Sequence, residues 1–315
     1  MGYKTKLIVL AGLSLTLVVL FLFFDLNNWE YALPRRGTKI FAIVITGAAI
    51  AFSTVIFQTI TNNRILTPSI IGLDSLYMLI QTFLIFMFGS TSVMVLNKHL
   101  NFGISVIVMV LFAGLLYKTL FKKGGQNIFF LLLVGIVLGT LFGSLSTFMQ
   151  VIIDPNEFLS VQNRMFASFN NVNTDLLWLS IILFFLISLY YFRFNKYLDV
   201  LSLGREHAIN LGVDYDYVIK RLLVIVAMLI SIATALVGPI TFLGLLVANV
   251  AYEFMKTYKH SYIIIAAMLI SIIALVGGQL IVERIFSFAT PLSVIVNFVG
   301  GVYFLYLLLK ESKKW

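Results

Sequence analysis

The stretch Leu201-Ser-Leu-Gly-Arg-Glu-His-Ala-Ile-Asn-Leu-Gly-Val-Asp-Tyr-Asp-Tyr-Val-Ile-Lys-Arg221 separates an apolar run that ends near Phe192 from another that begins at Leu222. A segment this polar must lie in water, whereas the runs on either side have the composition of membrane helices. Its apolar residues are interspersed with charged ones, which indicates a surface for a partner. These apolar residues are Ala208, Ile209, Leu211 and Val213.

The composition of the whole chain agrees with a membrane location. The chain has 315 residues, of which 61% are hydrophobic and 11% charged, and its mean hydropathy is +1.03. Soluble domains are about 45–50% apolar and about 25% charged. The chain is therefore a polytopic membrane protein. It has no cysteine, which excludes disulfides, thiolate metal sites and cysteine nucleophiles.

Ten segments approach the length of about 20 mainly apolar residues that a membrane helix needs. We therefore expect an all-α integral membrane protein with a single transmembrane domain over residues 1–315. The third and eighth segments are the weakest, because they are short or broken by glycine and polar residues. The segments are Leu7 to Phe24, Ile40 to Phe57, Ile70 to Phe88, Phe102 to Leu120, Ile128 to Ile152, Leu176 to Phe192, Leu222 to Val237, Thr241 to Phe254, Tyr262 to Val282 and Leu292 to Leu309.

The distribution of basic residues predicts the orientation. Ten spans place both termini on one side, and 16 of the 22 Lys and Arg residues then fall on that side. Because basic residues accumulate in cytoplasmic loops, we expect both termini in the cytoplasm. Residues 193–221, which we call the 193–221 loop, are then the longest cytoplasmic loop, and residues 153–175 form the longest external one. The external loop contains a helix-start signal, Asp154-Pro155-Asn156-Glu157.

Residues 204–212 fit a short amphipathic helix with Gly212 just after its last turn, at the C′ position. One interpretation is a solvated linker in which the helix is incidental. The other is a coupling helix that docks on a cytoplasmic subunit. The candidate coupling residues are Gly204, Arg205, Glu206, His207, Ala208, Leu211 and Gly212.

Glycines mark two further features. Gly135, Gly139 and Gly143 recur at every fourth residue of the fifth segment, a pattern that lets another helix approach closely. Helix packing is the main interpretation, and lining of a transport pathway is the alternative. The sequence Gly238-Pro-Ile-Thr-Phe-Leu-Gly244 predicts a tight external or re-entrant turn, since proline removes a helical donor and glycine permits unusual dihedral angles.

A basic group lies on the predicted external side, against the general bias. It consists of Arg35, Arg36 and Lys39, with Arg284 on a later external loop. Such residues anchor membrane proteins to phospholipid headgroups. Alternatively, they dock an acidic patch of an extracytoplasmic protein.

Several function classes lack their usual residues. Asp25, Glu253 and Glu283 fall at the ends of apolar segments. Only Asp74 sits slightly inside one, and we expect it near the cytoplasmic face. An ion-coupled secondary transporter usually has charge at the centre of the membrane. A membrane enzyme would need motifs such as His-Glu-x-x-His or Gly-x-Ser-x-Gly, which are absent, and no metal site is expected. The chain also has no Gly-Lys dipeptide, so it has no P-loop, and any ATP must bind another chain.

Five blocks of sequence, spread over most of the chain, resemble the FecCD-type permeases. This family contains the iron-siderophore and vitamin B12 importers of the ATP-binding cassette (ABC) class. One departure is Ala248-Asn249, where many members have Pro-His, and this resembles a subgroup associated with catecholate or mixed siderophores such as petrobactin. The blocks are Ala32 to Arg36, Ala48 to Gln58 continued by Asn63 to Leu73, Leu203 to Gly212, Gly238 to Val247, and Ala289 to Gly301.

The resemblance implies a type II ABC importer permease fold of about ten helices in a bacterial cytoplasmic membrane. It also implies a second permease subunit, identical or paralogous, two ATP-binding subunits and an extracytoplasmic siderophore-binding protein, with no nucleic acid. ATP and Mg²⁺ would bind the ATPase, so this chain would hold no cofactor and catalyse no reaction. Residues 204–212 would be the coupling helix, and Arg35, Arg36 and Arg284 would pair with glutamates of the binding protein. Transport would proceed by alternating access, with an ion-coupled secondary transporter as the alternative.

Overall fold

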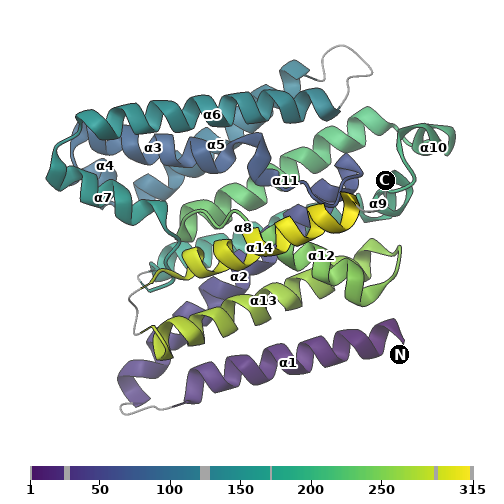
Figure 1. The fold of residues 1–315 in the computed structure, drawn as a ribbon, viewed down its shortest axis with the longest axis horizontal. Helices are drawn as coiled ribbons and strands as arrows, with labels where there is room; N and C mark the ends of the chain where they lie inside the picture. The colour runs from purple at the N-terminus through teal and green to yellow at the C-terminus, as the bar shows by residue number, and fades with distance from the viewer. Residues whose placement is uncertain (1, 25–28, 121–127, 171, 287–289, 313–315) are drawn as a thin grey trace.

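The computed structural model describes residues 2–24, 29–120, 128–170, 172–286 and 290–312, and this part of the chain is helical (Figure 1). Ala289 and four residues of the basic count, Lys122, Lys123, Lys313 and Lys314, lie outside these ranges. The elements in chain order are α1 (Tyr3–Phe23), α2 (Trp29–Thr61), the 3₁₀ helix η1 (Pro68–Ile71), α3 (Leu73–Phe88), α4 (Val93–Leu96), α5 (Lys98–Leu120), α6 (Ile128–Ile152), α7 (Pro155–Met165), α8 (Thr174–Phe192), α9 (Asn195–Leu201), α10 (Arg205–Asn210), α11 (Tyr215–Val237), α12 (Leu243–Met255), α13 (His260–Arg284) and α14 (Leu292–Ser312).

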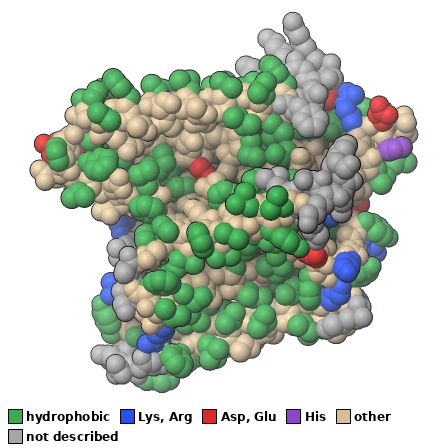
Figure 2. Space-filling view, viewed as in Figure 1, with side chains coloured by type: hydrophobic (Ala, Val, Ile, Leu, Met, Phe, Trp, Pro, Cys, Tyr) green, Lys and Arg blue, Asp and Glu red, His purple; other side chains and the backbone are tan. Residues whose placement is uncertain are grey.

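Each of the ten apolar segments predicted from the sequence contains a helix, so the all-α membrane class is confirmed. Seven described helices are long and apolar enough to cross a membrane: α1, α2, α5, α6, α8, α11 and α13. The remaining three, α3, α12 and α14, have shorter apolar stretches, so the number of spans is not fixed at ten. Hydrophobic side chains cover the middle of the visible surface, while most charged ones gather toward its two ends (Figure 2).

Helix α2 is the centre of the bundle. It packs against α11, α13, α12 and α8, and its residues from Ala42 onward are almost all buried. Small residues at positions 47–49 and 51 allow neighbouring helices to approach closely. The helix begins at Trp29, well before the predicted start at Ile40. Pro34 lies in its second turn, where the loss of one backbone donor does not end the helix.

The bundle has two distinct ends. The first turn of α1 and the last turns of α14 lie at the same end as α9 and α10, which we call the terminal face (Figure 1). Helices α4 and α7 lie at the other end, which we call the opposite face. Helix α7 follows the sequence signal identified above: Pro155 occupies its first turn, and the side chain of Asp154 accepts a hydrogen bond of 2.8 Å from the backbone N–H of Asn156. The expected surface helix is therefore present.

Two of the apolar segments are interrupted before their helices begin. In the first, η1 is followed by Gly72 at φ +86°, and α3 then runs for 16 residues. In the second, Gly238 at φ +104° ends α11, and the 13-residue α12 starts only at Leu243. At 1.5 Å per residue, both α3 and α12 are shorter than the roughly 30 Å hydrocarbon core. Their predicted starts at Ile70 and Thr241 were therefore too early.

Candidate functional site

The 193–221 loop folds as two short helices, α9 and α10, and its last residues form the start of α11. Glycine sets both ends of α10: Gly204 has φ +97° and Gly212 has φ +80°. Residues with a Cβ rarely adopt these angles, so glycine is required at both turns. Gly212 occupies the C′ position, as predicted, and its backbone N–H donates to Ile209 O at 2.9 Å. The backbone conformation of these two glycines therefore sets where the short helix begins and ends.

One side of α10 faces the protein and the other faces outward. Ala208 is fully buried, and Arg205, Glu206 and His207 are exposed. Apolar side chains lie beside these charges with large exposed fractions, 57% for Leu203, 44% for Ile209 and 64% for Leu211. Exposed apolar side chains rimmed by polar ones are typical of protein-binding surfaces. We call residues 203–212 the α10 surface.

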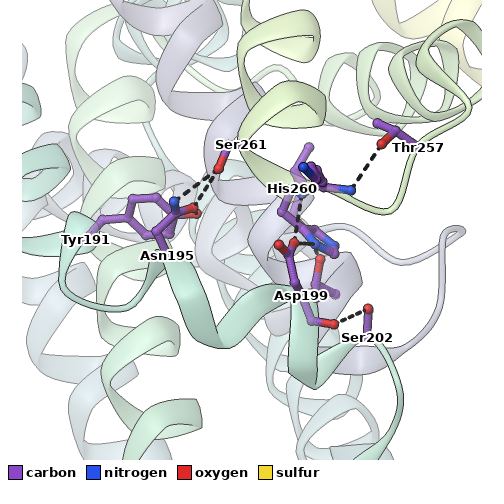
Figure 3. Close-up of polar contacts among 10 residues, drawn as sticks. Tyr191, Asn195, Asp199, Ser202, Thr257, His260 and Ser261 are labelled. Carbon is purple, nitrogen blue, oxygen red and sulfur yellow. Dashed lines mark hydrogen bonds and ion pairs between the residues drawn. The ribbon is translucent and has the colours of Figure 1, made fainter. Parts of the chain in front are cut away.

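A partly buried polar contact holds the base of this surface (Figure 3). Asp199, on α9, accepts a 2.9 Å hydrogen bond from the backbone N–H of His260, the first residue of α13. The Nδ1 atom of the His260 ring lies 2.7 Å from the same Asp199 oxygen. The imidazole is 4% exposed and the carboxylate 41%. Asp199 thereby connects α9 to the start of α13.

Asn195 adds a second link between the same helices. Its side-chain carbonyl accepts a hydrogen bond of 2.9 Å from the Tyr191 hydroxyl, and its amide donates to Ser261 Oγ at 3.0 Å (Figure 3). We call Asn195, Asp199, His260 and Ser261 the α9–α13 anchor. The sequence analysis missed it, because about sixty residues separate the partners and each is a common polar residue near a helix end. The sequence did carry one signal. Polar residues begin two of the helices, at Asn195 and His260, and both starts lie on the same predicted side of the membrane.

At the opposite face, two of the three candidate docking arginines are engaged within the chain. Arg36 donates to the carbonyls of Phe21 and Leu22, both at 3.2 Å, and of Phe24 at 2.8 Å. Arg284 donates to Phe24 O at 3.1 Å. These carbonyls belong to the end of α1, which has no further helical donors. A cation at a helix C-terminus is also favourable for the helix dipole.

The neighbouring charges differ in exposure. Lys39 on α2 and Glu283 on α13 form an ion pair of 2.5 Å, with each side chain 12% exposed. Arg35 is exposed, and its guanidinium donates to the Tyr31 hydroxyl one turn earlier in the same helix. Arg35 therefore keeps its charge turned outward, unlike Arg36 and Lys39 beside it.

The three glycines of α6 occupy different environments. A Cβ added to Gly135 would lie 2.8 Å from Ile71 Cα, and one added to Gly139 would lie 3.2 Å from Gly72 Cα. Both positions therefore allow the η1–α3 junction to pack directly on α6. A Cβ added to Gly143 would meet nothing within 4 Å. The structure thus brings the first two glycines together with one partner and leaves the third outside that contact.

A cavity opens at each end of the bundle. The cavity at the opposite face has a volume of about 630 Å³ and is lined by polar residues that include Asn101, Asn163 and Arg164. Arg164, on α7, donates to Val95 O at 3.0 Å and to the side-chain carbonyl of the buried Gln81. Burial lowers the pKa of the Arg164 guanidinium from its ordinary value. Arg164 thus fastens α7 to the helices beneath it.

The cavity at the terminal face has a volume of about 780 Å³. Its lining includes Asn62, Arg64, Asn249 and Tyr252, together with His260 of the anchor. Asn249, at the position where the sequence departs from the family pattern, donates to Arg64 O at 2.8 Å. Among the described residues, no group of three His, Cys, Asp or Glu side chains is placed to hold a metal ion.

A family model described as the FecCD transport family matches residues 6–310. The chain is similar to the petrobactin import system permease protein YclO of Bacillus subtilis, with 65% identity over the full length of both chains. It is 38% identical to the petrobactin import permease FatC of Bacillus anthracis, over 91% of this chain and 81% of that protein.

A solved structure supports the fold. It is described as an inward-facing conformation of a metal-chelate type ABC transporter. It superposes with a TM-score of 0.80 over 98% of this chain and all of that one, at 23% identity. At this identity the likeness concerns the arrangement of the helices alone.

Proposed function

This chain belongs to the FecCD transport family, and from that premise we propose that it is the membrane permease of an ABC importer for iron-siderophore complexes. The observation that carries the proposal is the 65% identity to a petrobactin import permease over the whole of both chains. Identity of this extent includes the membrane helices and the loops between them. It therefore supports the same class of substrate, an iron complex of a catecholate or mixed siderophore.

The α10 surface is proposed to bind the ATPase subunit that drives this transport. The chain has no Gly-Lys dipeptide and hence no P-loop, so ATP and Mg²⁺ would bind a separate ATPase subunit. The exposed charges at positions 205–207 and the exposed Ile209 and Leu211 fit a docking site on such a subunit. Two copies of this surface, one from each permease subunit, would contact the two ATPase subunits.

The α9–α13 anchor gives a route from this surface into the bundle. Because Asp199 and Asn195 are bonded to the first two residues of α13, a displacement of α10 is passed to a long helix that packs on α2. Helix α13 carries Glu283 and Arg284 at its far end. Alternating access needs such a two-state element, biased by partners at both ends.

The orientation follows from this assignment. The basic residues of the sequence favour the terminal face as the cytoplasmic one, and the ATPase would be there. Arg35 at the opposite face would then meet an extracytoplasmic siderophore-binding protein. A second permease subunit, identical or paralogous, would complete the membrane part.

Reconstitution tests the proposal. The permease, its ATPase and its binding protein are placed in liposomes, and uptake of radiolabelled ferric petrobactin is followed with and without internal ATP. We expect uptake that needs all the subunits and ATP. Uptake by the permease alone, driven by an ion gradient, would contradict the proposal, as would ATP-dependent uptake of vitamin B12 in preference to ferric petrobactin.

A further inference from the structure

Asp74 is a buried carboxylate in the middle of the bundle. It lies two residues after Gly72, which contacts Gly139, and Gly139 is near the midpoint of the 25-residue α6. Because α3 and α6 also share a hydrogen bond between Thr82 and Ser146, the two helices run alongside each other. Asp74 therefore lies near half the depth of α6, and the expectation that it lies near one face was wrong. The sequence pattern hid this, because η1 and Gly72 displace the start of α3 inward.

The carboxylate is incompletely satisfied. Its Oδ1 accepts a long hydrogen bond of 3.5 Å from Thr234 Oγ1, on α11, and Ser69 of η1 lines the same void as Asp74. Its Oδ2 is fully buried and has no hydrogen-bond partner among the described residues. The ion pairs found in the described part of the chain do not include Asp74. A charged carboxylate in such a place is costly unless something neutralises it.

A small void adjoins this carboxylate. It has a volume of about 10 Å³, which is room for about one water molecule or one small ion. Its polar lining consists of oxygen-bearing side chains, the ligands that hard cations prefer. The Thr54 hydroxyl donates to Ile50 O at 2.7 Å, so its lone pairs remain available. The oxygen-bearing residues that line the void are Thr54, Thr67, Ser69, Asp74, Thr234 and Thr241.

The void lies between the two large cavities. On α11, Thr234 lines the void and Ala235 lines the cavity of the opposite face. On α2, Thr54 lines the void and Gln58, one turn later, lines the cavity of the terminal face. The void is also where both interrupted segments meet, since Gly244 of α12 packs directly on Thr54.

We propose that Asp74, with Ser69 and Thr234, binds one monovalent cation of the size of Na⁺. A single carboxylate is neutralised by a single positive charge, and oxygen ligands around a one-atom space suit a small hard ion. The competing arrangement is a protonated Asp74 with one water molecule in the void, and the experiment below distinguishes it from a bound ion. The ion would hold η1 and α3 against α11 at the centre of the membrane. ATP would still drive transport, so this site is additional to the proposed function.

Binding of radiolabelled Na⁺ to the full-length chain in lipid nanodiscs tests the proposal. We expect saturable binding at constant ionic strength, displaced by unlabelled Na⁺ much better than by choline. Saturable binding should be lost in Asp74→Asn, which keeps the shape of the side chain and removes its charge. The matched control is Asp175→Asn, which changes an exposed carboxylate of the opposite face and should bind Na⁺ as the unchanged chain does.

A second variant covers the case in which Asp74→Asn does not fold. Thr234→Val keeps the carboxylate and the shape of the side chain but removes one ligand oxygen, and it should weaken Na⁺ binding measurably. The proposal is overturned if the unchanged chain shows no saturable Na⁺ binding, or if Asp74→Asn binds Na⁺ as well as the unchanged chain. A third outcome would show that Asp74 is protonated instead. In that outcome the unchanged chain binds no Na⁺, and its melting temperature equals that of Asp74→Asn at every pH from 5 to 8.

Discussion

The two ends of the bundle use their exposed charged residues differently. At the terminal face, Glu206 and His207 point outward beside exposed Ile209 and Leu211. At the opposite face, Arg36 and Arg284 point back into the chain and close the end of α1. Both groups appeared in the sequence as charged clusters next to apolar runs.

The difference teaches that a charge cluster at a membrane boundary has two physical uses. Where a helix ends with unsatisfied carbonyls, nearby arginines bond to those carbonyls. Around α10, glycines set the ends of a short helix and the backbone groups there bond to one another. The charged side chains of α10 therefore remain available to a partner. Four predictions test this comparison, each by setting two variants against each other.

The largest effect is expected at the α10 surface. The double change Glu206→Lys and His207→Glu reverses the charges offered to the ATPase. Unpaired charges in an interface cost about 2 kcal/mol or more, and 1.4 kcal/mol corresponds to tenfold. ATP-dependent uptake should therefore fall by about tenfold or more, while the amount of inserted permease is unchanged.

The matched control for that change is His99→Glu with Asp175→Lys, which reverses an exposed pair of the opposite face, 3.7 Å apart. Its uptake should remain within about twofold, because exposed pairs contribute about 0–1 kcal/mol. Equal loss of uptake in both double variants would remove the distinction between the two faces.

The glycines of α6 extend the same contrast to the interior. Gly135→Ala places a Cβ 2.8 Å from the backbone of Ile71, and overpacking of this kind costs about 1–3 kcal/mol. Gly143→Ala meets open space and should leave stability unchanged or slightly improved, since alanine favours the helix. Thermal unfolding in nanodiscs measures both. A lower melting temperature for Gly143→Ala than for Gly135→Ala would contradict the packing described.

The α9–α13 anchor is expected to matter for coupling as well as for stability. Asp199→Ala leaves the buried His260 ring and its backbone N–H without their acceptor, at a cost of about 1–3 kcal/mol. Asp199→Asn retains an acceptor oxygen and should lose less. The ratio of iron taken up to ATP hydrolysed should fall in Asp199→Ala and recover partly in Asp199→Asn. An unchanged ratio in both variants would make the anchor a local structural contact only.

The smallest effects are expected from the arginines. Arg36→Ala removes a side chain that satisfies three carbonyls of α1 and should lower stability by about 1 kcal/mol. Arg35→Ala should change stability by less than about 0.5 kcal/mol but weaken capture of the binding protein, more at low salt than at high salt. Equilibrium binding at two ionic strengths measures this. No dependence on salt would favour headgroup anchoring for Arg35.

Much of the fold could be predicted from the sequence, because the periodic and compositional signals are local. The apolar runs became helices, Asp154-Pro155 began α7, and Gly212 ended α10 at the expected residue. These features depend on neighbouring residues only. Helix starts were less accurate where tertiary packing decides, as at Trp29, where the helix continues through Pro34.

The functional contacts were harder to predict, because they join distant parts of the chain. His260 and Asp199 meet only after α13 folds back onto α9, and no local pattern reports this. The depth of Asp74 depends on the packing of Gly72 against Gly139, although the glycine spacing did indicate a close approach. Whether an arginine caps a helix or faces a partner likewise depends on where α1 ends in space.

Site-specific crosslinking tests the comparison most directly. The chain has no cysteine, so single cysteines at Leu211 and Arg35 can each carry a photoreactive maleimide in the assembled transporter. We predict that Leu211→Cys crosslinks to the ATPase subunit and Arg35→Cys to the binding protein. A Leu211→Cys adduct with the binding protein, or no ATPase adduct at that position, would contradict the account.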